Sequence, residues 1–287
     1  MSYEQFTLTY EALSPISHGG DSPGGNENPL NKIKMTVEED GNSFKEDVPI
    51  ISGNAVRGIL RDRVAYDYLD QLGAEVSDVL AYALYSGGYL DRGGGKIDRR
   101  LREQVRENIP MLSVFGTALQ SEAMRSKLDI GIVFPIASET ENYTGVPSDE
   151  SVAEYQDTIS YTRLDDLKEA GSPEIRDTLK EGAVQTAEDA DRTQMNRNRF
   201  RVLAPGAPFK QDLTLRHATD VERGVVGRAF DLFEENPVFG GRSAVGHGRV
   251  AFEFEEGRPD AAPYLEYLEN NRDDLRGYVT ELDAQLS

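Results

Sequence analysis

Two arginines in the first quarter of the chain have the type and spacing to hold phosphate groups. They are Arg57 and Arg61, in the segment IISGNAVRGILRD. Ser52, Gly53 and Asn54 precede them and indicate a helix start, whose free N–H groups attract anions. On that helix the two arginines would lie one turn apart, so they would share a face and could contact successive phosphates. An ordinary capped helix with arginines paired to surface carboxylates is the alternative.

A second candidate segment, GGRSAVGHGRV, begins at Gly240. Its four glycines permit left-handed backbone and let another chain approach closely. Arg242 and Arg249 add guanidinium groups that fit phosphate, and His247 could hydrogen-bond a phosphate or a base. The segment is neither a Walker motif nor a dinucleotide-binding motif, because it lacks Gly-Lys-Ser/Thr and the required glycine spacing. A glycine-rich hairpin is the alternative interpretation.

The charge of the chain excludes a simple polycation. The sequence has 31 Lys and Arg against 51 Asp and Glu, for a net charge of −20. Lys supplies only 8 of those 31 cations, a composition typical of halophilic proteins. In molar salt the Debye length falls to about 3 Å, so the surface carboxylates repel one another little. A mesophilic acidic protein that avoids nucleic acid is the alternative.

The composition also limits the chemistry and the location of the protein. With no Cys and 3 His, we expect no disulfide, no thiol catalysis, no metal and no cofactor. No apolar run approaches the ~20 residues that cross a bilayer. The first residues, MSYEQFTLTY, lack the features of an export signal. We therefore expect a cytoplasmic protein with no membrane partner.

Strands and helices alternate along the chain and indicate an α+β protein. The expected elements are a strand at residues 6–13, a hairpin turning at Asp40-Gly41-Asn42, helices at 55–68 and 76–85, a strand at 128–135, strands on both sides of Pro205-Gly206, a helix at 221–233, a strand at 249–255 and a helix at 263–286. This order favours a sheet with helices on one face, and a ferredoxin-like βαββαβ core is the most economical arrangement.

Taken together, the two candidate segments resemble the RAMP superfamily of CRISPR proteins. The match is to the subunits that line up along guide RNA in an effector complex. Three further motifs lie between the segments as they do in those subunits: LYSGG ending at Gly88, VFG ending at Gly116, and RFRVLAPGAPF starting at Arg199. The backbone subunit of type IV systems is the most similar and that of type III systems is second.

The resemblance implies a fold, a division of the chain and a set of partners. The fold would be a ferredoxin-like (RRM-like) palm with large finger and thumb insertions. Residues 1–136 would form the first part of the palm with a helical finger, 137–198 the thumb, and 199–287 the rest of the palm with a C-terminal helix. The expected partners are guide RNA (crRNA), target nucleic acid, copies of the chain in a helical filament, and other effector subunits in antiviral defence. A solvated surface hairpin is the alternative for 137–198.

The segments and the resemblance also predict which residues contact RNA. They are His18, Ser52, Gly53, Asn54, Arg57, Arg61, Gly87, Gly88, Arg163, Met195, Gly240, Gly241, Arg242, Ser243, His247 and Arg249. Arg163 and Met195 lie near the ends of the thumb-like insertion, where the related subunits place a side chain that flips a base. Short-range contacts must dominate in molar salt, where little counterion release remains.

Catalysis is not expected, although type III relatives cut target RNA with a loop aspartate and a metal. The corresponding position here is Glu27, with Asp21 as another carboxylate in the same loop. A Glu has a longer reach, and in-line attack demands tight positioning. One alternative function is a metal-dependent endoribonuclease that cuts target RNA at regular intervals. Another is a halophilic α+β protein that binds a small phosphorylated ligand.

Overall fold

The protein is an α+β chain built around one antiparallel sheet, as the sequence predicts. The computed structural model describes residues 2–20, 27–39, 42–88, 99–119, 122–163 and 196–286. The order of strands in the main sheet is β12 (Val250–Phe254), β1 (Tyr3–Ala12), β11 (Pro208–Arg216) and β7 (Leu128–Ile130), with β8 (Phe134–Pro135) also paired to β11. Every one of these pairs is antiparallel.

The strand β1 pairs with both β11 and β12, and alternating burial shows that one of its faces lies on the core. Phe6, Leu8, Tyr10 and Ala12 are buried, whereas the residues between them are more exposed. This is the two-residue period of a strand with one face on a core. The strand predicted from this pattern is therefore confirmed, with its start three residues earlier, at Tyr3.

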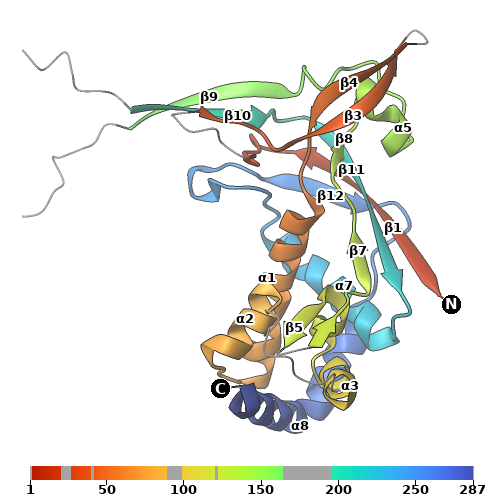
Figure 1. Ribbon diagram of the computed structural model, residues 1–287, viewed down its shortest axis with the longest axis vertical. Helices are drawn as coiled ribbons and strands as arrows, with labels where there is room; N and C mark the ends of the chain where they lie inside the picture. The colour runs from red at the N-terminus through yellow and green to blue at the C-terminus, as the bar shows by residue number, and fades with distance from the viewer. Residues whose placement is uncertain are drawn as a thin grey trace, which may run out of the picture.

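The longer helices gather at one end of the molecule and the long hairpins at the other, where the short helix α5 (Glu141–Thr144) also lies (Figure 1). Two long helices, α1 (Gly53–Leu72) and α7 (Asp220–Glu235), pack together. Phe230 of α7 lies against Phe252 and Phe254 of β12, with ring centroids 5.9 and 4.8 Å apart, so α7 covers part of the sheet. The other helices are α2 (Asp78–Ser86), α3 (Arg99–Asn108), α4 (Pro110–Phe115) and α8 (Ala262–Leu286).

Both long helices begin at caps that the sequence supplies. The side chain of Ser52 accepts a hydrogen bond from the N–H of Ala55 and caps α1. In α7, Thr219 and Glu222 form a reciprocal capping box. Each cap satisfies backbone donors that a helix start leaves free.

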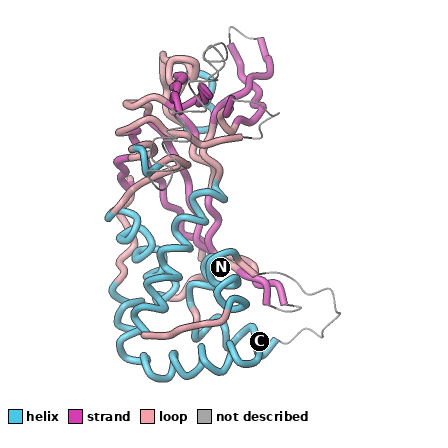
Figure 2. Tube along the Cα trace, turned by 90° about the vertical axis from the view of Figure 1, so that its left-hand side faces the viewer, coloured by secondary structure: helices cyan, strands magenta, loops and turns pink. Residues whose placement is uncertain are grey.

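Two smaller sheets lie at the opposite end, away from the long helices, as the perpendicular view also shows (Figure 2). The hairpin β3 (Lys32–Glu39) and β4 (Asn42–Pro49) has Glu39 paired with Asn42, so the chain turns where the sequence predicts, although Asp40 and Gly41 lie outside the described residues. The other sheet has the order β2 (Glu27–Asn28), β10 (Asn196–Leu203) and β9 (Gln156–Arg163). Among the described residues there are also the paired strands β5 (Thr117–Leu119) and β6 (Glu122–Met124), and 3-10 helices at Ser138–Thr140 and Ser243–Val245.

One predicted feature differs in the structure. The single strand expected at residues 128–135 is interrupted between β7 and β8, where Val133 pairs with Ile51. The strands predicted on either side of Pro205-Gly206 are confirmed as β10 and β11, and they belong to different sheets, β10 to the second and β11 to the main one. The chain therefore crosses from one sheet to the other at this turn.

Candidate functional site

The loop that follows β1 meets the glycine-rich segment near the C-terminus. Gly241 donates its N–H to the carbonyl of Ser17 at 2.8 Å, and Gly248 donates to Pro15 at 2.9 Å. Gly240 has φ of 74°, and a Cβ there would lie 2.4 Å from the Ser17 oxygen. Only glycine fits that close approach. The loop Gly240–Gly248, which we call the glycine loop, is therefore fixed against the loop after β1.

The same loop after β1 also meets the start of α1, through His18. The His18 Nε2 accepts a hydrogen bond from the N–H of Ser52 at 3.2 Å and lies 3.3 Å from the amide nitrogen of Asn31. Burial lowers the pKa of His18, which favours the neutral ring. A neutral ring that accepts at Nε2 carries its proton on Nδ1. Two segments almost 190 residues apart in sequence, near Ser52 and Gly241, thus lie on either side of His18.

Arg242 presents an exposed cation at the edge of the glycine loop. Its φ and ψ are 67° and 27°, in the left-handed region, which costs about 1 kcal/mol or more in a residue other than glycine. The guanidinium carbon lies 3.2 Å from the ring centroid of Phe200 and 5.7 Å from that of Tyr161. Aromatic faces attract a cation in this position. The strained backbone therefore aims the guanidinium across β10 and β9.

His247 supports the glycine loop from inside. The residue is only 3% exposed, and its Nε2 hydrogen-bonds the hydroxyl of Tyr161. Burial and the nearby charge of Arg242 lower the pKa of His247. The sequence led us to expect a contact with phosphate or a base, but the enclosed ring cannot reach such a ligand in this arrangement. Its role is to hold the glycine loop on β9.

Arg57 and Arg61 face inward, contrary to the expectation that they contact phosphates. Arg61 donates to the carbonyls of Phe115 and Gly116 at 2.6 and 2.7 Å. Arg57 donates to Phe115 at 3.1 Å and to Leu128 at 3.3 Å. Burial lowers the pKa of both arginines. The last carbonyls of α4 have no partner within that helix, and these two side chains satisfy them.

Three of the glycines predicted to contact RNA serve packing within the chain. A Cβ at Gly88 would lie 1.9 Å from the carbonyl oxygen of Ala118, and one at Gly53 would lie 2.3 Å from that of Ile130. Gly87 lies directly over the guanidinium of Arg61. The absence of a side chain at these three glycines is therefore explained by close contacts within the chain, without a contact to RNA.

The other predicted residues divide into exposed positions and positions that the structure does not describe. Asn54, Gly240, Gly241, Ser243 and Arg249 are exposed. Asp21, Met195 and the side chains of Glu27 and Arg163 lie outside the described residues. Glu27 is paired in register with Arg199 at the start of β2, and Arg163 with Asn196 at the end of β9.

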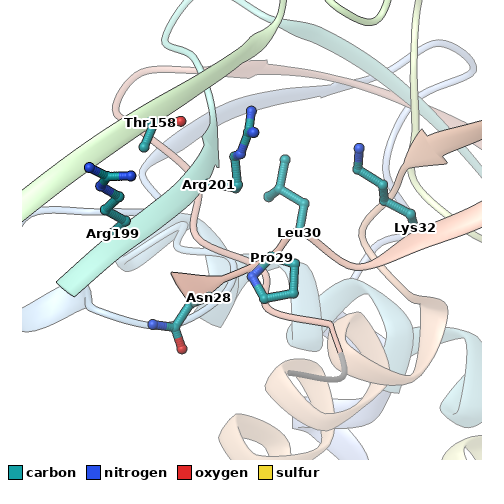
Figure 3. A pocket seen from close by; sticks show the side chains of 7 residues that line it. All are labelled: Asn28, Pro29, Leu30, Lys32, Thr158, Arg199 and Arg201. Carbon is teal, nitrogen blue, oxygen red and sulfur yellow. The ribbon is translucent and has the colours of Figure 1, made fainter. Parts of the chain in front are cut away.

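A basic pocket that the sequence analysis missed lies between the two small sheets (Figure 3). It has a volume of about 440 Å³ and is lined by Asn28, Pro29, Leu30, Lys32, Thr158, Arg199 and Arg201. None of these residues is a carboxylate. The sequence contained one indication of it, because arginines at every second position of a strand share a face. Within the described ranges, no group of three or more His, Asp or Glu could hold a metal ion, and no helix could cross a membrane.

No protein-family model matches the chain, and no curated protein is similar to it in sequence. A solved structure described as "Type IV-B CRISPR Complex" contains a similar chain, with 20% identity and a TM-score of 0.62. The match covers 88% of this chain and 90% of that one. The two chains share a fold. The match extends over most of both chains, so the likeness is one of the overall fold.

Proposed function

We propose that the protein is a backbone subunit of a CRISPR effector complex. In this function it binds guide RNA, oligomerises along it and presents it for pairing with a target. The observation that carries the proposal is the convergence on the loop after β1, where Ser17 pairs with Gly241 and His18 accepts from Ser52. The similarity to a chain of a Type IV-B CRISPR complex supports it and makes other subunits of such a complex the expected partners.

The proposal includes a ferredoxin-like palm. In chain order the main elements are β1, α1, β7, β11, α7 and β12, which is a βαββαβ sequence. The sheet order β12-β1-β11-β7 places the first and third strands of that sequence at the centre. In this assignment β9 and β10 form the base of the thumb, and the hairpin β3–β4 extends from the palm beside them.

The proposed guide-binding surface uses short-range contacts. Its members are the exposed loop residues Gly240, Gly241, Ser243 and Arg249, the guanidinium of Arg242, and the first turn of α1 at Ser52 and Asn54. Backbone N–H groups, hydroxyls and guanidinium groups at such positions bind phosphate and 2′-OH groups. These contacts keep their strength in molar salt better than long-range attraction does, because salt screens the latter first. The −20 charge of a halophilic chain is therefore compatible with this function.

Co-purification tests the proposal. The protein is purified from its host in high salt, and the ratio of absorbance at 260 and 280 nm, the size of the assembly and the sequence of any bound RNA are measured. We expect a large assembly that contains RNA with CRISPR repeat sequence. The purified chain mixed with such RNA should form regular filaments in electron micrographs. A monomer that is free of nucleic acid and does not bind added repeat RNA would contradict the proposal.

A further inference from the structure

The strand β10 presents different chemistry on its two faces. Phe200 and Val202 are buried, at 3% and 0% exposure, whereas Arg199 and Arg201 are exposed. Successive side chains of a strand point to opposite faces. Arg242 of the glycine loop lies over the ring of Phe200. The glycine loop therefore covers one face of the β2–β10–β9 sheet, and the two arginines of β10 belong to the other.

The basic pocket is built on this other face. Arg201 is directly opposite Thr158 in the β9–β10 ladder, so the two side chains are neighbours. Lys32 approaches from the start of β3, and Leu30, 3% exposed, lies between them. Figure 3 shows the ends of Arg201 and Lys32 pointing the same way on either side of Leu30.

Backbone hydrogen bonds hold the floor of the pocket in place. Gly20 donates to the carbonyl of Pro29 at 3.0 Å, and Asn31 donates to that of His18 at 2.8 Å. The segment that carries Pro29 and Leu30 is thus fixed to the loop after β1. The pocket is a preformed feature of the fold.

Two cations of the pocket, Arg201 and Lys32, differ from other cations of this acidic chain in having no carboxylate partner among the described residues. Elsewhere Lys127 pairs with Glu222 at 2.6 Å, and Arg216 pairs with Asp129 at 2.6 Å. Among the described residues, no carboxylate forms an ion pair with Arg201 or Lys32. Like charges that face one cavity repel each other, and a bound anion offsets that repulsion because it attracts both cations.

We infer that this pocket is a phosphate-binding site that holds a phosphodiester of a nucleic-acid strand. Arg201 and Lys32 supply the charge, and the hydroxyl of Thr158 and the amide of Asn28 supply further hydrogen-bonding groups. The volume of about 440 Å³ is in the range of sites that take a nucleotide-sized group. Because the pocket and the glycine loop lie on opposite faces of one sheet, they hold different segments of nucleic acid. The inference rests on the proposed function and adds a second contact to it.

Charge-removing variants test the pocket. Arg201→Gln and Lys32→Gln are compared with Arg272→Gln, which removes one exposed cation from α8 outside the pocket. Binding of fluorescently labelled single-stranded RNA is followed by anisotropy at several salt concentrations. Each pocket variant should weaken binding about ten-fold, because a charge-assisted hydrogen bond to phosphate is lost. The slope of log affinity against log salt should also fall in magnitude by about 0.7 per variant.

Two controls separate binding from folding. The melting temperatures of the pocket variants should equal that of the wild type, because both side chains are exposed. Arg201→Lys keeps the charge and should recover most of the lost affinity. Equal RNA affinity and equal salt slopes for Arg201→Gln and Arg272→Gln would overturn the inference, even where the wild type binds RNA and the proposed function stands.

A titration with inorganic phosphate and adenosine monophosphate covers the case in which the wild type binds no RNA. That result would remove the proposed function and, with it, a nucleic-acid strand as the source of the phosphate. Calorimetric binding of adenosine monophosphate that is lost in Arg201→Gln would still support the phosphate chemistry of the pocket. If the wild type binds neither inorganic phosphate nor adenosine monophosphate, the pocket is not a phosphate-binding site.

Discussion

The Nε2 of His18 accepts a hydrogen bond from the backbone N–H of Ser52 at 3.2 Å, which joins the loop after β1 to the first turn of α1. The ring can accept only while that nitrogen is unprotonated. Burial favours this state by lowering the pKa of His18. A neutral His18 is therefore needed to hold the loop after β1 against α1. Because Ser17 of the same loop pairs with Gly241, the position of the glycine loop depends on it as well.

The first prediction concerns the pH dependence of this contact. His18 has a lower pKa in the folded chain than in the unfolded chain, so its contribution to stability is complete above about pH 6.5 and declines as the pH falls below that value. At pH 7.5, His18→Gln should lower the free energy of unfolding by about 1 kcal/mol. The difference between the two proteins should shrink at pH 5.5 in denaturant titrations. A difference that grows towards low pH would contradict this account.

The second prediction separates the backbone of Arg242 from its charge. Arg242→Gly relieves the left-handed strain by about 1 kcal/mol and loses a cation–π contact of about the same size, so the melting temperature should change little. Arg242→Ala keeps the strain and loses the contact, so it should be about 1 kcal/mol less stable than Arg242→Gly. Both variants should bind single-stranded RNA about ten-fold more weakly than wild type. Unchanged RNA affinity in Arg242→Gly would exclude a guanidinium contact with RNA.

The third prediction assigns Arg61 a structural role. Arg61→Met removes the donor to the carbonyl of Gly116 and one of the two donors to that of Phe115, which Arg57 also contacts, and should lower the free energy of unfolding by about 3 kcal/mol. Arg272→Met, which changes an exposed arginine of α8, should have almost no effect. At a temperature where both variants are folded, their RNA affinities should be equal. A loss of RNA binding in Arg61→Met without a loss of stability would restore the phosphate contact expected from the sequence.

The fourth prediction concerns Glu222, which accepts from the N–H of Thr219 and pairs with Lys127. Burial alone would raise its pKa, but the hydrogen bonds from Lys127 and from the N–H of Thr219 lower it overall. The carboxylate therefore stabilises the fold above the unfolded pKa of about 4.3, and this contribution is lost as the pH falls through the folded value.

Glu222→Gln should accordingly reduce stability by about 2 kcal/mol at pH 7 and by much less near pH 3. Urea titrations at the two pH values measure the difference. Glu266→Gln, on the exposed side of α8, is the matched control and should behave as wild type at both. A pH-independent difference between Glu222→Gln and wild type would mean that shape, rather than charge, matters at this position.

The fifth prediction is a shallow salt dependence of RNA binding by the wild-type chain. Four exposed cations belong to the proposed contacts: Lys32, Arg201, Arg242 and Arg249. Single-stranded RNA that releases one ion for each of them gives a log–log slope of about −2.8. Hydroxyls and backbone N–H groups add to the affinity without adding to the slope, so we expect a magnitude no greater than this. Anisotropy titrations at about 0.5 to 2 M KCl measure the slope. A slope steeper than about −4 would require more cation–phosphate contacts than the proposed surface offers.

Local patterns in the sequence were sufficient for most elements, because neighbouring residues determine them. The two-residue alternation of Phe6, Leu8 and Tyr10 predicts β1. A cap at Ser52 or Asn54 predicts the start of α1, and the structure uses Ser52. The Asp-Gly turn predicts the hairpin of β3 and β4, whose register follows from the turn. The predicted thumb boundaries stay a prediction, since residues 164–195 lie outside the described part of the chain.

The candidate site was only partly predictable, because a helical period states which residues share a face but not what that face meets. Arg57 and Arg61 do share a face, as predicted, but that face meets the free carbonyls at the end of α4. The alternation of Arg199 and Arg201 indicates a basic strand face, but the sequence does not show that this face forms a pocket with Lys32 and Thr158, which are distant in sequence. Only the pairing of β9 with β10, and the backbone hydrogen bonds of the loop after β1, bring them together, and such long-range contacts depend on the packing of the whole chain.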